Sequence, residues 1–130
     1  MGEDVTRDDI RDFFYTLTGE LKYYRHGNDA EKLEHCYPLF HKKKLAGLAY
    51  YKPYREDVKE FGIVLREELQ GKGNGEKAIK GIIEIAKENK VKELIAKVMV
   101  DNKRMIKLMG KLGWLEFENH SDYKMFKKTL

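Results

Sequence analysis

Three glycines alternate with polar residues in Gln70-Gly71-Lys72-Gly73-Asn74-Gly75, a stretch between a strand-like run and an amphipathic helix. Glycine has no β-carbon, so these positions allow a tight turn and a close approach of the backbone to a ligand. The first N–H groups of the following helix lack partners within the helix, and they lie at the positive end of its dipole. The stretch therefore predicts a strand–turn–helix unit that binds the phosphate groups of a cofactor.

The segments around this stretch predict a parallel crossover. Residues 60–65 have the pattern of a buried strand, and residues 94–100 alternate as another strand. Between them, apolar residues recur at helical spacing: Ala78, Ile79, Ile82, Ile83 and Ala86. A strand, a helix and a strand of this length imply a right-handed connection between two parallel strands.

The remaining segments complete the predicted fold. After the crossover we expect a helix over residues 103–112, with Gly113 just beyond its end, and an antiparallel hairpin of residues 114–118 and 123–128. The first half begins with a strand that ends at Val5 and a helix that Thr6 caps. Apolar residues recur along that helix: Ile10, Phe13, Phe14, Leu17 and Leu21.

A shorter helix and two strands follow in the first half. Gly27-Asn28 breaks the first helix, and Asp29 caps a second one that carries Ala30, Leu33 and Tyr37 and that Pro38 ends. Residues 39–43 and 45–51 have the pattern of strands, and Pro53 closes this region. The sequence therefore predicts an α/β (α+β) fold with a mixed sheet and flanking helices.

Composition favours one soluble globular domain over residues 1–130. Hydrophobic residues make up 42% and charged residues 37%. No apolar run has the length of a membrane span, and the first residues do not resemble a signal peptide, so we expect a cytoplasmic protein without a membrane partner. The 26 basic and 22 acidic residues are mixed along the chain, which argues against nucleic acid as a partner. Cys36 has no second cysteine with which to form a disulfide.

Three common glycine motifs do not fit. A P-loop starting at Gly71 would need Gly-Lys-Ser/Thr where the chain has Glu76, Lys77 and Ala78, so the magnesium-binding hydroxyl is missing. In a dinucleotide fingerprint the third glycine would fall at position 76 rather than at Gly75. The kinase glycine loop fails on the same spacing, and the chain has no His-Arg-Asp catalytic loop.

Two ordered blocks resemble the GNAT N-acetyltransferase superfamily. Residues 63–75 are similar to its acetyl-CoA motif, a strand followed by Gln-x-x-Gly-x-Gly. Residues 102–114 are similar to its later block, which has an asparagine, an amphipathic helix, a glycine and an aromatic residue. The opening residues 5–17 resemble the first strand and helix of the family. The resemblance implies a sheet of about six to seven strands around a central strand–loop–helix motif.

The resemblance also implies where acetyl-CoA binds. The pantetheine arm would lie along Ile63, Val64 and Leu65 like an added strand. The diphosphate would bind at Gln70, Gly71, Lys72, Gly73, Asn74 and Gly75, with Glu76 opening the helix beneath it. Asn102 would contact the pantetheine or an ordered water. No metal is implied, because the sequence has no metal-ligand spacing.

The implied reaction is the attack of a primary amine on the acetyl thioester. A base must remove a proton from the amine, and Glu60 is the candidate. Counting back from Gln70 places the family's glutamate at Lys59, so a bulge in this strand would have to restore the phase. Many members have a tyrosine acid where this chain has Met109, and Tyr123 is the candidate substitute. A strand N–H, that of Leu65 or its neighbour, would stabilise the oxyanion.

The acceptor side leaves several interpretations open. Tyrosines and histidines concentrate in the first half, where the family builds its acceptor pocket: Tyr23, Tyr24, Tyr37, Tyr50, Tyr51, Tyr54, His35 and His41. Cys36 is more typical of a structural thiol than of a nucleophile. One alternative is an inactive domain that senses acetyl-CoA, which Met109 favours. Another is a lysine-rich surface that binds nucleic acid or a protein. The family resemblance also allows a homodimer.

Overall fold

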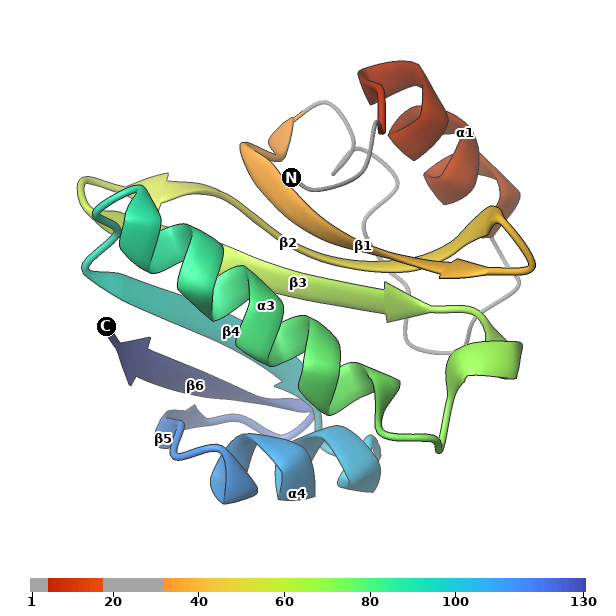
Figure 1. Cartoon of the computed structure of the whole chain (residues 1–130). Helices are drawn as coiled ribbons and strands as arrows, with labels where there is room; N and C mark the ends of the chain where they lie inside the picture. Colours follow the sequence, from red (N-terminus) through yellow and green to blue (C-terminus); the bar gives the residue numbers. More distant parts are fainter. Residues whose placement is uncertain (1–4, 18–31) are drawn as a thin grey trace.

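The computed structural model describes residues 5–17 and 32–130. Its helices and strands follow in chain order (Figure 1): α1 (Arg7–Leu17), β1 (His35–His41), β2 (Lys44–Arg55), β3 (Val58–Leu65), a 3₁₀ turn (Glu67–Leu69), α3 (Asn74–Glu88), β4 (Glu93–Met99), α4 (Lys103–Lys111), β5 (Leu115–Asn119) and β6 (Tyr123–Thr129). No helix within these two ranges is both long and apolar enough to cross a bilayer.

The strands form one six-stranded mixed sheet in the order β1-β2-β3-β4-β6-β5. Neighbouring strands are antiparallel except β3 and β4, which are parallel and are joined through α3, as the sequence pattern predicts. The β3–β4 pairing covers only Val58 to Glu60 against Glu93 to Ile95. Beyond that point the two strands diverge, so the sheet opens in its middle (Figure 1).

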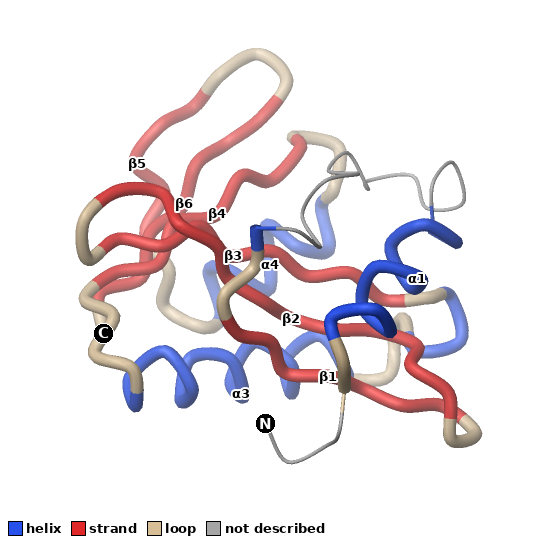
Figure 2. The backbone as a smooth tube through the Cα atoms, turned by 90° about the horizontal axis from the view of Figure 1, so that it is seen from above, coloured by secondary structure: helices blue, strands red, loops and turns tan. Residues whose placement is uncertain are grey.

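Helices on opposite faces of the sheet cover two hydrophobic clusters (Figure 2). On one face, Ile79 and Ile82 of α3 pack with Met109 of α4. On the other, Phe13 and Phe14 of α1 pack with alternate residues of β2. The helical spacing is therefore confirmed for α3 and, in α1, for Ile10, Phe13 and Phe14.

The predicted helix ends are also confirmed. Thr6 and Asp9 exchange reciprocal hydrogen bonds, each 3.0 Å long, at the start of α1. Gly113 follows α4 with φ of +83°, the left-handed conformation that glycine adopts readily beyond a helix end.

The expected helix through Tyr37 is wrong in the part that the structure describes. Tyr37 and Pro38 lie in β1, which runs from His35 to His41. A proline is tolerated there because β1 is at the edge of the sheet. Pro53 does not close its region either, since β2 continues to Arg55. Val5 is not in a strand.

Several expected features lie outside the described residues. They are Leu21, Tyr23, Tyr24, the Gly27-Asn28 break, the Asp29 cap and Ala30.

Candidate active site

The stretch between β3 and α3, which we name the glycine loop (residues 70–76), turns at two glycines. Gly71 and Gly73 have φ of +74° and +80°, a conformation that strains residues with a β-carbon. Gly73 is the N-cap of α3. Gly75 lies inside the helix, where a β-carbon would make ordinary contacts with Leu108 at 3.5 Å and Leu65 at 3.8 Å. The turn therefore depends on two of the three glycines.

Backbone N–H groups of the glycine loop are available to a ligand. The Leu69 N–H donates to the Arg66 carbonyl, the Gln70 N–H donates to the Glu67 carbonyl, and the Lys77 N–H donates to the Gly73 carbonyl. Within the part of the chain that the structure describes, the N–H groups from Gly71 to Glu76 make no backbone hydrogen bond. A run of such donors at a helix N-terminus suits phosphate oxygens.

Two side chains of the glycine loop hold its shape. The Gln70 amide nitrogen donates to the Leu65 carbonyl at 2.9 Å, and the Asn74 amide nitrogen donates to the Leu69 carbonyl at 2.9 Å. Both bonds join the loop to the segment before it. The diphosphate contact expected of the Gln70 side chain would require this side chain to leave the Leu65 carbonyl.

Glu76 links the two helices on this face of the sheet. Its carboxylate accepts from Lys111 of α4 at 2.8 Å and pairs with Lys80 of α3 at 2.9 Å. These hydrogen bonds, that of Lys111 first, lower the pKa of Glu76 to about 2. The residue therefore stays ionised and neutralised by lysines at the start of α3, beside the expected phosphates.

A basic side chain that the sequence did not reveal lies beside the turn. The Arg104 guanidinium, from α4, would be 3.8 Å from a β-carbon at position 71. Within the described ranges Arg104 forms no ion pair. A guanidinium in this position is suited to an anion bound at the glycine loop.

The part of β3 beyond Glu60 has an edge that faces β4 without pairing to it. The Arg66 N–H donates to Ala46 of β2 at 2.8 Å. Because peptide groups alternate in direction along a strand, those of Ile63 and Leu65 point away from β2 and toward the opening. The Ile63 backbone can therefore bind an extended, amide-containing ligand as an added strand does.

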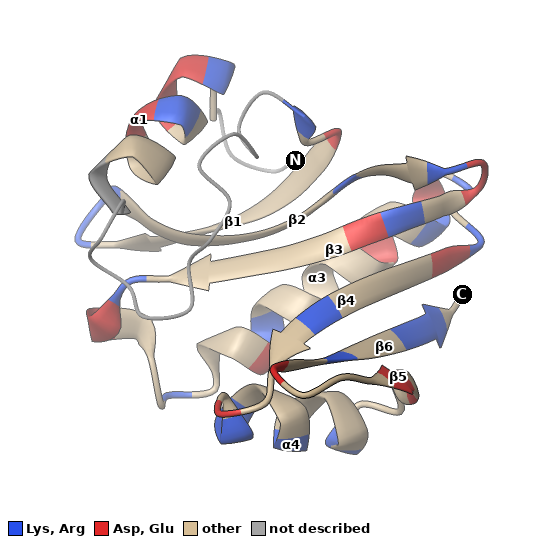
Figure 3. Cartoon of the chain, turned by 180° about the vertical axis from the view of Figure 1, so that it is seen from behind, with Lys and Arg blue, Asp and Glu red and all other residues tan. Residues whose placement is uncertain are grey.

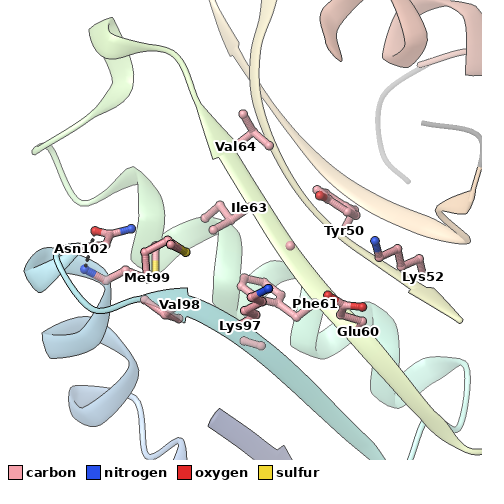
Figure 4. Close-up of a pocket in the computed structure, with 13 residues that line it drawn as sticks. Tyr50, Lys52, Glu60, Phe61, Ile63, Val64, Lys97, Val98, Met99 and Asn102 are labelled. Atoms are coloured by element: carbon pink, nitrogen blue, oxygen red, sulfur yellow. Dashed lines mark hydrogen bonds between the residues drawn. The ribbon is translucent and has the colours of Figure 1, made fainter. Parts of the chain in front are cut away.

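A cavity of about 110 Å³ lies where β3 and β4 diverge, and we name it the cleft (Figure 4). Strand β3 contributes residues 60–64, and strand β4 contributes residues 96–99. The other lining side chains come from β2 and from the start of α4: Tyr50, Lys52, Asn102 and Met105. The cleft thus joins the open edge of β3 to both expected site residues, Glu60 and Asn102.

Glu60 reaches the cleft without a bulge in β3. Neighbouring Lys59 has an ion pair with Glu34 at 2.8 Å, whereas Glu60 has none with a described residue. The expected bulge in β3 is wrong: the register shift is in β2, between Pro53 and Arg55. Glu60 is therefore the residue of this pair that lines the cleft.

Tyr50 lies over Gly62, the residue opposite it in β3. The two residues are register partners, and a β-carbon at position 62 would overlap with the Tyr50 ring and hydroxyl. The ring is almost fully buried and packs edge-on against Phe14, with centroids 5.5 Å apart. Gly62 therefore makes room for a rigid tyrosine at the wall of the cleft.

Asn102 combines a structural contact with an exposed amide. Its Oδ1 accepts from the Met105 N–H at 3.3 Å and caps α4. Figure 4 shows its amide nitrogen directed toward the cleft. The side chain is placed to donate to a bound ligand while it holds the helix start.

Met109, at the position of the family's tyrosine acid, and the candidate substitute Tyr123 both lie outside the cleft lining. Met109 is completely buried in the core, so this position of α4 faces the sheet. Tyr123 pairs with Met99 at the end of β4, and its ring stacks on His120. The acid role of Tyr123 stays a prediction.

Other candidates are structural. Cys36 is fully buried, and burial raises the pKa of its thiol to about 11, so it is a poor nucleophile. Over residues 5–17 and 32–130, no three His, Cys, Asp or Glu side chains are grouped to hold a metal ion.

The cleft also contains charged residues that sequence reasoning missed, Lys52 and Lys97. Lys97 had a recognisable signal, because it interrupts an otherwise buried or half-buried strand. The residues that face Lys97 across the cleft could not be predicted from the sequence, because they depend on the order of the strands in the sheet.

Solved acetyltransferases share this fold. The ribosomal-protein-alanine N-acetyltransferase from Brucella melitensis aligns over 98% of both chains with a TM-score of 0.78 and 19% identity. An IAA acetyltransferase from Bacillus cereus covers 98% of this chain and 97% of its own, with a TM-score of 0.80 and 17% identity. The alignment with a Bacillus subtilis acetyltransferase in complex with CoA covers 99% of this chain and 95% of that chain, with a TM-score of 0.74 and 22% identity.

Sequence comparison identifies the family. No curated protein matches the chain significantly. The family model of the GNAT acetyltransferases matches residues 3–114, which include the glycine loop, the cleft and α4. The protein is therefore a member of the GNAT acetyltransferase family.

Proposed function

We propose that the protein is an N-acetyltransferase that transfers an acetyl group from acetyl-CoA to a primary amine. The observation that carries the proposal is the continuity of two surfaces, the unpaired N–H groups of the glycine loop and the open edge of β3. One fits a diphosphate, and the other fits the amides of a pantetheine arm. The solved relative in complex with CoA supports the same cosubstrate.

The residues that would hold acetyl-CoA divide by the type of contact. Backbone N–H groups from Gly71 to Glu76 would bind the diphosphate, with Arg104 and Lys72 adding positive charge. The backbone of Ile63 and the amide of Asn102 would bind the pantetheine. Acetyl-CoA supplies an activated acyl group, and the chain positions its thioester in the cleft.

Glu60 would act as the general base. An amine of pKa near 10 is mostly protonated at neutral pH and must lose a proton to attack. The carboxylate of Glu60 would accept this proton, directly or through a water, as the new C–N bond forms. The N–H of Leu65 or Ile63 would stabilise the oxyanion. The C–S bond then breaks, and CoA leaves as a thiolate that needs little assistance, since thiol pKa values are about 8.5.

Basic and acidic residues are interspersed along the helices and strands in the view from behind (Figure 3). This distribution supports an enzyme with a small or peptide acceptor rather than a nucleic-acid-binding domain.

Two measurements test the proposal together. Calorimetric titration with CoA should give one site per chain. Release of free CoA thiol should then follow with at least one amine from a panel of polyamines, aminoglycosides, amino acids and peptide N-termini. Binding without turnover on any amine would favour a sensor of acetyl-CoA, and no binding of CoA would refute the proposal.

A further inference from the structure

The charged lining of the cleft is mixed rather than acidic. Lys52 and Glu60 are direct register partners on β2 and β3, and Lys97 lies on β4 across the opening (Figure 4). Every other lining side chain is uncharged. An acceptor whose only charges are positive would therefore meet ammonium groups as well as the carboxylate of Glu60.

Aromatic contacts hold Lys97 in place. Its ammonium lies 4.4 Å from the centroid of the Tyr123 ring, within the range of a cation–π interaction. Tyr123 in turn stacks on His120, with centroids 4.3 Å apart, and the His120 Nε2 is 2.8 Å from a carboxylate oxygen of Glu118. The exposed Lys97 side chain is thus held by an aromatic contact beside the cleft.

Lys97 differs from Lys124 in having no carboxylate partner among the residues that the structure describes. Lys124, on the adjacent strand β6, pairs with Glu116 at 3.0 Å. Neither Lys97 nor Glu60 forms an ion pair with any residue in the described ranges. Of the two cleft lysines, Lys97 is the one on the wall opposite Glu60, and within those ranges neither Lys97 nor Glu60 is neutralised by an ion pair.

From this arrangement we infer that the acceptor is a small zwitterionic amine. Its amino group binds at Glu60 and a carboxylate or similar anionic group binds at Lys97; this inference rests on the proposed N-acetyltransferase activity. Glu60 pairs with Ile95, and Lys97 is two residues further along β4. Regular sheet spacing would separate the two Cα atoms by roughly 8 Å, and the divergence of β3 and β4 beyond Glu60 makes this a minimum, so the two charges of the acceptor are several bonds apart.

Matched acceptors test the inference in the full-length protein. We would compare glycine, β-alanine and 4-aminobutyrate with the corresponding amides and with diamines of equal chain length. Each amide keeps the amine and removes the negative charge, and each diamine reverses that charge. We expect kcat/KM for the best amino acid to exceed that of its amide and its diamine at least tenfold.

Variants of Lys97 assign the preference to this residue. Lys97→Met should raise KM for the amino acid about tenfold and leave kcat/KM for the amide unchanged, and Lys97→Glu should favour the diamine. Lys124→Met is the matched control, because Lys124 is on the next strand, does not line the cleft and should leave the preference intact. CoA affinity and melting temperature establish that each variant is folded.

Two results would overturn the inference. If the wild type acetylates amides or diamines as well as amino acids, or if Lys97→Met leaves the ratio unchanged, the zwitterion assignment fails while the N-acetyltransferase proposal stands. If no amine is acetylated, both fail, and the CoA titration shows whether the cofactor site survives.

Discussion

The glycine loop and the cleft are built in different ways. The glycine loop presents backbone N–H groups, whose positions follow from two glycines of positive φ and the start of one helix. The cleft presents side chains from three strands and a helix that are far apart in the sequence. Local sequence therefore determines the first, whereas the second depends on which strands become neighbours.

This contrast predicts two classes of variant. Changes in the glycine loop should weaken CoA binding and leave the chemical step unchanged once the enzyme is saturated. Changes to the charged side chains of the cleft, Glu60 and Lys97, should alter turnover or acceptor preference and leave CoA affinity unchanged. A glycine-loop variant that altered acceptor preference, or a cleft variant that weakened CoA binding, would show that the two regions are energetically coupled.

The largest effect is expected for Glu60→Gln in the cleft. At pH 7 we expect kcat to fall about 100-fold, because the amide cannot accept the proton of the amine. At pH 9.5 the loss should be smaller, since a larger fraction of the amine is already unprotonated. Steady-state kinetics at both values test this, with Glu88→Gln on the exposed end of α3 as control. An equal loss at both pH values would indicate a structural role.

Gly73→Glu should have the largest effect in the glycine loop. It places a carboxylate beside the expected phosphates, and we predict at least a tenfold rise in Kd for CoA, about 1.4 kcal/mol. Calorimetry gives the constant.

Two controls separate charge from backbone strain in this experiment. Gly110→Glu adds the same side chain on α4, where an added β-carbon also has no atom within 4 Å. Gly73→Asn keeps a residue that tolerates positive φ and adds no charge. An unchanged Kd in folded Gly73→Glu would count against the glycine loop as the cofactor site.

Tyr123→Phe sharpens the comparison inside the cleft region. The hydroxyl lies outside the cleft lining while the ring contacts Lys97, so we expect kcat within threefold of the wild type and an unchanged acceptor preference. A tenfold or greater loss of kcat would instead identify Tyr123 as the proton donor to the leaving thiolate.

The smallest effect concerns Glu76, which joins α3 to α4. Its folded-state pKa of about 2 is below the ordinary value of 4.5, so its contribution to stability is complete above about pH 5 and is lost as pH falls toward 2. Glu76→Gln should lower the melting temperature by a few degrees at most at pH 7, and the difference should shrink on acidification. Glu84→Gln, in a longer and more exposed pair, is the control. A difference in melting temperature that did not change with pH would show that the ion pairs of Glu76 are not its cause.

The sequence predicts the crossover from β3 through α3 to β4, the start of α3 and the end of α4, because the signals for these features are local. Gly71, Gly73 and Gly113 adopt the positive φ that their positions suggest. The sequence misplaces β1, because a proline normally ends a helix and the edge position that tolerates Pro38 is a property of the whole sheet.

The cleft is predictable only in part. Glu60 and Asn102 were expected, although counting from Gln70 favoured Lys59 and required a bulge in β3. The register shift lies in β2 instead, which no count along β3 can reveal. Tyr50 was one of several tyrosines expected on the acceptor side, whereas Lys52 and Lys97 were not expected in the site, since alternation shows which face a residue occupies but not what lies across the opening.

A crystal structure with bound CoA tests the central claim most directly. We predict that the diphosphate oxygens lie within hydrogen-bond distance of N–H groups between Gly71 and Glu76, with the pantetheine extended along Ile63 into the cleft. A diphosphate bound at any other surface, or a pantetheine that does not enter the opening between β3 and β4, would contradict the account.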